Sequence, residues 1–328
     1  MGQVYLAEDL HNENCKVVIK QTKLEKGVEE QQQMAKIFFR EADLLKRLNH
    51  RGIVKLTDSF WAQDEPEFMF LVMEYVPGQN LEKILAADGP LPSETVIKIA
   101  IQCCDVLEYL HSREVPIIYR DLKPSNLILR PDGLVVFVDF GIARDFEPKG
   151  PSTRVVTSGY APPEQYFGKP EPRGDIYSLG ATMHQLLTGV RPRPLTPCSP
   201  ASILPAVLKD LDTLVRCMTC QELDDRPPSA RAVQFELFHQ YQLFHPEFEI
   251  PDLGLDEEPE LPGRAIPAES PSKAGAIKLA GVNGALAVEH RNWHVQKTGK
   301  TKSAVGTDKV IAQTLFAKIK QWFNQWRT

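Results

Sequence analysis

Several features that would place the chain in a special class are scarce or absent. The 328 residues include only 6 cysteines, scattered without the spacing of a disulfide framework, which predicts reduced thiols and a cytoplasmic protein. The first residues lack the pattern of a signal peptide, and no run of about 18 apolar residues occurs, so we expect no membrane-spanning helix. The net charge of −5 gives no reason to expect a nucleic-acid partner.

Two of the cysteines, Cys217 and Cys220, have the C-x-x-C spacing of some metal and redox sites. No second cysteine pair or histidine cluster accompanies them, and they lie in a helical pattern. We therefore interpret them as thiols of the core.

The remaining composition is that of a soluble globular protein, with 42% hydrophobic and 25% charged residues. The length is sufficient for one large domain or two ordinary ones. The polar residues that suggest a function are concentrated in residues 117–141.

This stretch carries a hairpin pattern. Its segments 127–129 and 134–138 are apolar and flank a Pro-Asp-Gly turn, which predicts two short strands. A hairpin of this kind brings Asn126 and Asp139 to the same end of the ribbon. Two side-chain oxygens placed together suit Mg²⁺, which prefers one or two protein oxygens plus phosphates and water.

The same stretch resembles the catalytic and metal-binding loops of the protein kinases, whose pattern is H-R-D-L-x-x-x-N followed by D-F-G. Here the sequence reads Y-R-D-L-K-P-S-N at 119–126 and D-F-G at 139–141. The resemblance implies that Asp121 accepts the proton of the substrate hydroxyl. It also implies that Asn126 and Asp139 hold Mg²⁺ or Mn²⁺ against the phosphates of ATP.

Two neighbouring positions refine this resemblance. Lys123, two residues after Asp121, is similar to the serine/threonine version of the loop, and we assign it a catalytic role. Tyr119 stands where the family usually has histidine. That position mainly supports packing in the family, so we expect little effect on the chemistry.

The chain begins with a pattern that resembles the second half of the kinase glycine-rich loop. Gly2 and Val4 match the end of G-x-G-x-x-G-x-V, whereas the first strand and two glycines are absent. We therefore expect that Met1 is an internal methionine and that this form binds ATP weakly. Lys20 ends a V-V-I-K segment that is similar to the strand whose lysine reaches the α- and β-phosphates.

A helix is expected at residues 28–49, where the resemblance pairs Glu41 with Lys20. Strands are expected at 54–60 and 68–74, and the segment after them resembles the hinge between kinase lobes. Around ATP, the resemblance implies backbone hydrogen bonds to adenine and apolar contacts with its faces. The residues expected there, besides Gly2, Lys20 and Glu41, are Val4, Val18, Met73, Glu74, Val76 and Ile128.

Helical periodicity predicts a helix at 93–111 with Ser93 as its N-cap, a helix that opens at Gly174, and another at 211–223. Residues 142–159 are irregular and precede an A-P-E-like element, so they resemble the kinase activation loop. Regulatory or structural roles are implied by the resemblance for Arg120, Thr157, Glu164, Asp175 and Arg226. Of these, Arg120 is the residue type that pairs with a phosphate, and Arg226 resembles the partner of Glu164.

After residue 245 the composition changes. Residues 246–307 begin with a part rich in acidic residues and proline and continue with a part rich in small residues. This composition predicts a flexible linker. Residues 308–327 have apolar side chains at helical spacing, and residues 271–328 contain ten Lys and Arg against two acidic residues. A basic amphipathic helix of this kind suggests contact with a membrane surface or an acidic partner. Docking onto the chain's own globular part is an equal alternative.

The sequence as a whole predicts an α+β, two-lobed protein kinase fold over residues 1–245. The β-rich N-lobe would span 1–76, without its first strand, and the helical C-lobe 77–245. The implied reaction is transfer of the ATP γ-phosphoryl group to serine or threonine hydroxyls of proteins in signalling, in the bacterial branch of the family. The alternative is a catalytically weak or silent kinase fold that acts as a binding module. The A-P-E-like element disfavours a sugar or aminoglycoside phosphotransferase.

Overall fold

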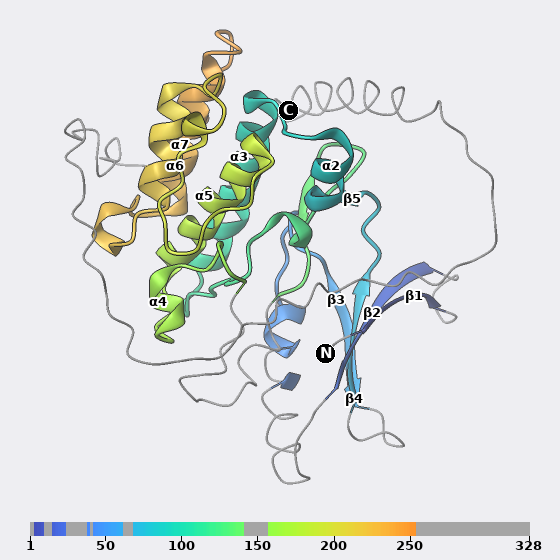
Figure 1. Ribbon diagram of the computed structural model, residues 1–328. Helices are drawn as coiled ribbons and strands as arrows, with labels where there is room; N and C mark the ends of the chain where they lie inside the picture. Colours follow the sequence, from blue (N-terminus) through green and yellow to red (C-terminus); the bar gives the residue numbers. More distant parts are fainter. Residues whose placement is uncertain are drawn as a thin grey trace.

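The computed structural model describes residues 3–9, 15–23, 38–39, 42–61, 68–140 and 157–253. It confirms the predicted two-lobed arrangement, with a β-sheet of N-terminal strands beside a helical body (Figure 1). The predicted Gly2 and Glu41, most of the activation loop and the C-terminal helix at 308–327 lie outside the described residues.

The N-lobe sheet is formed by the strands β1 (Gln3–Asp9), β2 (Cys15–Lys23), β3 (Leu56–Trp61) and β4 (Phe68–Glu74). Their order is β1-β2-β4-β3, and every neighbouring pair is antiparallel. Strand β4 has the predicted bounds, whereas β3 begins and ends slightly later than predicted. Within the described residues, β1 forms one edge of this sheet, and its Leu6 side chain is 62% exposed.

A helical segment packs on the N-lobe sheet. Of the helix predicted at 28–49, residues 38–39 and 42–49 are described. Residues 38–39 and 42–46 are helical, so the helix ends at Lys46 and not at residue 49 as predicted. Phe38 and Ala42 from this segment are buried against Leu56, Met69 and Leu71 from the sheet. Apolar burial therefore attaches this helical segment to the sheet that carries Lys20.

The C-lobe is built on buried helices. Its core is shared by α3 and α5, in which nearly every apolar side chain is buried. The C-lobe helices are α2 (Leu81–Asp88), α3 (Ser93–His111), α4 (Pro163–Tyr166), α5 (Pro172–Thr188), α6 (Lys209–Met218) and α7 (Ala230–Gln242). Short 3₁₀ turns occupy η1 (Pro124–Asn126), η3 (Pro200–Ser202) and η4 (Leu223–Asp225).

The predicted hairpin lies between the two lobes. Strands β6 (Leu127–Leu129) and β7 (Val135–Phe137) pair antiparallel, and the short strand β5 (Gln79–Asn80) adds to the other edge of β6. The amide of Val138 donates to the carbonyl of Asn126 at 2.9 Å, so the pairing continues beyond the strand ends. The hairpin thus brings Asn126 close to Asp139, as predicted.

Three predicted helix boundaries need correction. Ser93 is the first residue of α3 rather than its cap, because Pro92 takes the cap position without a side-chain bond. Helix α5 begins at Pro172, two residues before Gly174, and proline is well suited to a first helical turn because it lacks an N–H. Helix α6 ends at Met218 instead of continuing to Leu223.

The segment after α6 is bound by a side chain. The carbonyl of Cys220 accepts a 2.8 Å hydrogen bond from Arg226 Nε, and that of Gln221 accepts one at 3.0 Å from Arg226 Nη2. Arg226 thus satisfies main-chain carbonyls just beyond the end of the helix.

The globular packing also extends beyond the predicted boundary at residue 245. Phe248, Ile250 and Leu253 pack against the C-lobe core, and Phe248 stacks on Phe238 with ring centroids 5.6 Å apart. The Gln242 side chain donates to the carbonyl of Phe248 at 2.7 Å. Residues 246–253, predicted as the start of a linker, are therefore part of the packed C-lobe.

Candidate active site

The Asp121 carboxylate lies at the centre of the candidate site and is held by three side chains. Thr157 Oγ1 donates to its Oδ1 at 2.9 Å, Asn126 Nδ2 donates to its Oδ2 at 2.9 Å, and Lys123 Nζ lies 3.0 Å from Oδ2. Asp121 is only 7% exposed. The carboxylate therefore has a defined orientation, as a group that accepts a proton at one position requires.

Lys123 and Thr157 also contact each other. Lys123 Nζ donates to Thr157 Oγ1 at 3.0 Å, which closes a three-membered network with Asp121. Thr157 belongs to the end of the predicted activation loop. Thr157, for which the resemblance implies a regulatory or structural role, thus contacts the catalytic loop.

A second pair of charged groups lies across the interlobe space. Lys20 from β2 forms an ion pair with Asp139, the first residue of the D-F-G segment. Both contribute to a cavity between the N-lobe sheet and the C-lobe. The cavity is lined by Lys20, Leu45, Ile53, Val54, Leu56, Leu71, Met73, Asp139 and Phe140.

Strand register places the predicted nucleotide contacts on one face of the sheet. Lys20 and Val18 are two residues apart in β2, so their side chains share a face. Val4 is directly opposite Lys20, and Met73 is directly opposite Val18, so they lie on that face too. Because Met73 and Lys20 line the cavity, this is the face toward the interlobe space.

The predicted hinge and adenine contacts lie next to this face. Val76 is buried with Val54, Leu134 and Val136, and Met73 and Ile128 pack against the same cluster. The main-chain N–H of Glu74 donates to the Lys55 carbonyl at 3.0 Å. The hinge is therefore anchored to the N-lobe through Lys55.

The catalytic segment has an unusual backbone. Arg120 and Asp139 have φ values of 66° and 65°, in the left-handed region that non-glycine residues rarely adopt. Such conformations persist only where surrounding contacts enforce them, and they are concentrated at functional sites. Arg120 directly precedes Asp121, and Asp139 is itself one of the groups that we assign to the chemistry.

Asp175 enforces part of this geometry from inside α5. Its buried carboxylate accepts 2.8 Å hydrogen bonds from the main-chain N–H groups of Tyr119 and Arg120. His111 Nε2 lies 2.8 Å from the same carboxylate. The role of His111 as a partner of Asp175 could not be inferred from the sequence, because 64 residues separate the two.

Tyr119 supports the same segment from the other side. Its hydroxyl donates to the Val138 carbonyl at 2.6 Å, and its ring packs edge-on against Phe137 and Phe140 at 4.9 and 5.0 Å. The tyrosine at the usual histidine position therefore connects the catalytic loop to the metal loop by packing, in line with the prediction.

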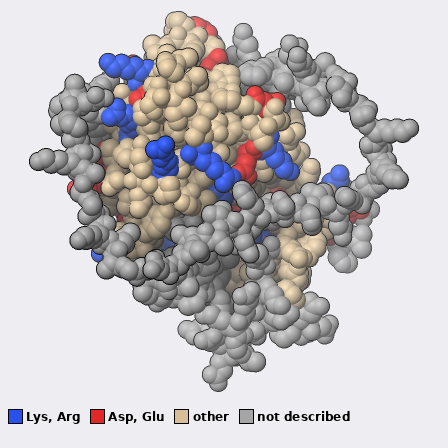
Figure 2. Space-filling view, viewed as in Figure 1, with Lys and Arg blue, Asp and Glu red and all other residues tan. Residues whose placement is uncertain are grey.

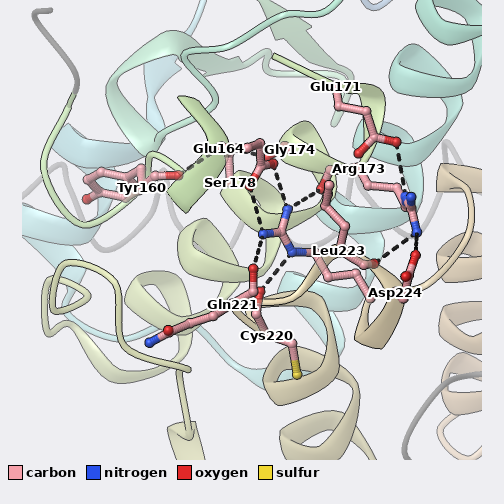
Figure 3. Close-up of polar contacts among 11 residues, drawn as sticks. Tyr160, Glu164, Glu171, Arg173, Gly174, Ser178, Cys220, Gln221, Leu223 and Asp224 are labelled. Atoms are coloured by element: carbon pink, nitrogen blue, oxygen red, sulfur yellow. Dashed lines mark hydrogen bonds and ion pairs between the residues drawn. The ribbon is translucent and has the colours of Figure 1, made fainter. Parts of the chain in front are cut away.

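Glu164 and Arg226 form an ion pair with two hydrogen bonds, at 2.8 and 3.0 Å (Figure 3). Arg226 is 1% exposed, and its remaining donor groups bind main-chain carbonyls. Gly174 packs against this pair, where an added Cβ would lie 3.0 Å from Glu164 Oε1. The pair thus fixes α4 against α5 and η4.

The oxygen donors of the site fit a divalent cation. Asn126 Nδ2 donates to the carbonyl and the carboxylate of Asp121, both acceptors, so the amide must be oriented with its Oδ1 on the other side. Asn126 Oδ1 and the carboxylate of Asp139 are hard oxygen ligands of the type that Mg²⁺ takes. No group of three or more His, Cys, Asp or Glu that could hold a metal occurs in the described ranges.

The described surface carries charges of both signs. Lys and Arg side chains lie beside Asp and Glu side chains on the face shown in Figure 2. Among the helices that the structure describes, none is both long enough and apolar enough to cross a membrane. Cys217 is buried and Cys220 is partly buried, and both are free thiols, consistent with their interpretation as core residues.

Comparisons with known proteins identify the family. Residues 1–234 match the protein kinase domain. Serine/threonine-protein kinase C from Synechocystis sp. is 34% identical over 256 residues, which cover 71% of this chain and 47% of that protein. Serine/threonine-protein kinase PknA from Nostoc sp. is 37% identical over 206 residues, which cover 59% of this chain and 36% of that protein. The chain therefore spans about half the length, or less, of these relatives.

Solved structures show the same fold. The kinase domain of Mycobacterium tuberculosis PknI is 25% identical, with a TM-score of 0.59, and the match covers 73% of this chain and 90% of that one. PpkA-294 in its apo form is 23% identical, with a TM-score of 0.60, and the match covers 72% of this chain and 91% of that one.

Proposed function

The chain belongs to the protein kinase family, and we propose that it transfers the γ-phosphoryl group of ATP to serine or threonine hydroxyls of proteins. The observation that carries this proposal is the Asp121 carboxylate, held by Asn126, Thr157 and Lys123 near the Lys20–Asp139 pair. Phosphoryl transfer requires mainly positioning and charge stabilisation, and these residues supply both.

Each residue has a distinct role in this proposal. Asp121 accepts the proton of the attacking hydroxyl, and Lys123 lies beside it with a positive charge for the transferred group. Lys20 binds the phosphates of ATP. The hinge at Glu74 and Val76 binds adenine through main-chain groups.

Asn126 and Asp139 would hold Mg²⁺ or Mn²⁺. When bound, the cation neutralises negative charge on the phosphate oxygens. Lys20 contacts Asp139 in the structure, so phosphate and cation would compete with this ion pair on nucleotide binding. The predicted partnership of Lys20 with Glu41 stays a proposal.

Protein substrates and a role in signalling are also proposals, supported by the printed names of the relatives. For residues 308–327, outside the described part of the chain, we propose contact with a membrane surface or an acidic partner, with docking on the chain's own kinase domain as the alternative. Ten basic residues against two acidic ones in 271–328 support an anionic contact.

Phosphate transfer from labelled ATP to a general protein substrate tests the activity. We expect phosphoserine and phosphothreonine as products, and a rate about 100-fold or more lower in Asp121→Asn. Binding of a fluorescent ATP analogue should be nearly unchanged in that variant, because Asp121 acts on the hydroxyl and not on the nucleotide. Absence of both transfer and nucleotide binding in the wild-type chain would refute the kinase activity and favour a binding module.

A further inference from the structure

We propose that Gln165 is a positioning residue for Asp121, an inference that rests on the proposed kinase function. Gln165 lies on α4, and its Nε2 donates a 3.2 Å hydrogen bond to the main-chain carbonyl of Arg120. Arg120 directly precedes Asp121. The peptide plane that joins these two residues is therefore bound by a side chain from an element 45 residues later in the chain.

The contact matters because Arg120 is held in an unfavourable backbone conformation, with φ at 66°. Its main-chain N–H is bound by Asp175 at 2.8 Å, and its carbonyl is bound by Gln165. The two polar backbone groups of Arg120 are thus fixed from two elements, α5 and α4. Loss of the second contact would remove one restraint on the peptide between Arg120 and Asp121, and the position of Asp121 would be less well defined.

Gln165 is itself well anchored. The preceding residue, Glu164, has both carboxylate oxygens bound by the buried Arg226. The main-chain N–H of Gln165 donates to the Pro162 carbonyl at 3.1 Å. Helix α4 is therefore held in place, and with it the backbone that carries the Gln165 side chain. Through Gln165, the Glu164–Arg226 pair acts on the catalytic loop.

The proposed role predicts a specific kinetic effect. Gln165 binds the main chain before Asp121, whereas Lys20 and Asp139 make no contact with it in the described structure. Removing the Gln165 donor should therefore lower kcat and leave the KM for ATP unchanged, because nucleotide contacts remain in place.

Two variants of similar length separate positioning from packing. Gln165→Met removes the donor, and Gln165→Glu places an acceptor against the Arg120 carbonyl while its carboxyl group is ionised. Near neutral pH we expect kcat to fall about tenfold in both variants, because each loses one hydrogen bond. At lower pH the new carboxyl group becomes protonated and can donate, so the kcat ratio of Gln165→Glu to Gln165→Met should rise.

A matched control exists elsewhere in the C-lobe. Gln221 Nε2 donates a 2.7 Å hydrogen bond to the carbonyl of Leu195, which is also left-handed, with φ at 53°. Gln221→Glu removes the same kind of bond, to the same kind of strained residue, away from Asp121. We expect its kcat to equal that of the wild type at every pH.

Hydrogen–deuterium exchange provides a readout independent of activity. Gln165→Met should accelerate exchange in the peptide that contains residues 119–122, and Gln221→Glu should not. Unchanged kcat and unchanged exchange in Gln165→Met would overturn the proposal, as would a pH-independent ratio of the two Gln165 variants. If the wild-type chain transferred no phosphate, the kinase proposal would fail, and the exchange result would still decide whether Gln165 orders the backbone at Asp121.

Discussion

The Asn126 amide nitrogen donates two hydrogen bonds to Asp121, one to its carbonyl and one to its Oδ2, each at 2.9 Å. This side chain therefore helps to orient the proposed proton acceptor, and its own Oδ1 points away from Asp121, where Ser125 Oγ donates to it at 3.4 Å. Asn126 therefore contacts the proposed proton acceptor and is also a proposed ligand of the cation. Changes at the metal-binding residues should consequently affect both nucleotide binding and transfer.

The first prediction concerns Asp139. Asp139→Asn should weaken binding of Mg²⁺ with ATP by at least about tenfold and lower the transfer rate, because the cation loses a charged ligand. Titration of a fluorescent ATP analogue with and without Mg²⁺ measures the effect. Asp132→Asn, at an exposed turn residue that pairs with Arg130, is the control and should behave as the wild type. An unchanged Mg²⁺ dependence in Asp139→Asn would contradict the assignment.

The second prediction concerns the Glu164–Arg226 pair. Arg226→Met should reduce the free energy of unfolding by about 3–5 kcal/mol, because it leaves the largely buried Glu164 carboxylate unpaired. Urea unfolding measures this change. Asp224→Ala breaks an ion pair with Arg173 in which Asp224 is 98% exposed, and should cost less than about 1 kcal/mol. Equal effects of the two substitutions would show that burial does not control the strength of these pairs.

The third prediction concerns pH. Burial lowers the pKa of His184 on α5, and Asp212 acts in the opposite direction. The folded state thus binds the His184 proton less readily than the unfolded state. Its contribution to stability should be complete above the ordinary value of about 6.5 and should be lost as the pH falls below it.

Urea unfolding at about pH 7.5 and about pH 5.5 tests this titration. His184→Gln, which cannot titrate, should lose less stability than the wild type over this interval. The exposed His239 on α7 serves as the control, and His239→Gln should follow the wild type. The same pH dependence in all three proteins would exclude His184 as the group responsible.

The fourth prediction concerns residues 308–327. If this segment contacts a membrane, the full chain should bind anionic lipid vesicles with an affinity that falls as salt rises, because the basic side chains are screened. Trp322 and Trp326 would report insertion through a blue shift of fluorescence. Vesicles of neutral lipid are the control. The absence of a blue shift at low salt would exclude membrane contact. Docking on the chain's own kinase domain or binding to a protein partner would then be the remaining roles for this segment.

The sequence determined the local elements, and its resemblance to the protein kinases supplied the proposed reactive groups. Strand β4 and helix α3 have the predicted bounds, because their patterns of apolar residues extend over a full element. The hairpin that brings Asn126 near Asp139 followed from a turn between two apolar segments. These features depend on neighbours in the chain, so a single sequence is sufficient to predict them.

The resemblance implied the distant pair Glu164–Arg226, but only the tertiary structure revealed two other long-range contacts around the catalytic loop. The pairing of His111 with Asp175 and that of Gln165 with Arg120 depend on how α3, α4 and α5 pack around the catalytic loop. Tertiary contacts also bind Arg226 to a carbonyl beyond the end of α6 and hold residues 246–253 on the C-lobe. Such contacts join residues far apart in the sequence, and no periodicity or turn signal encodes the path that brings them together.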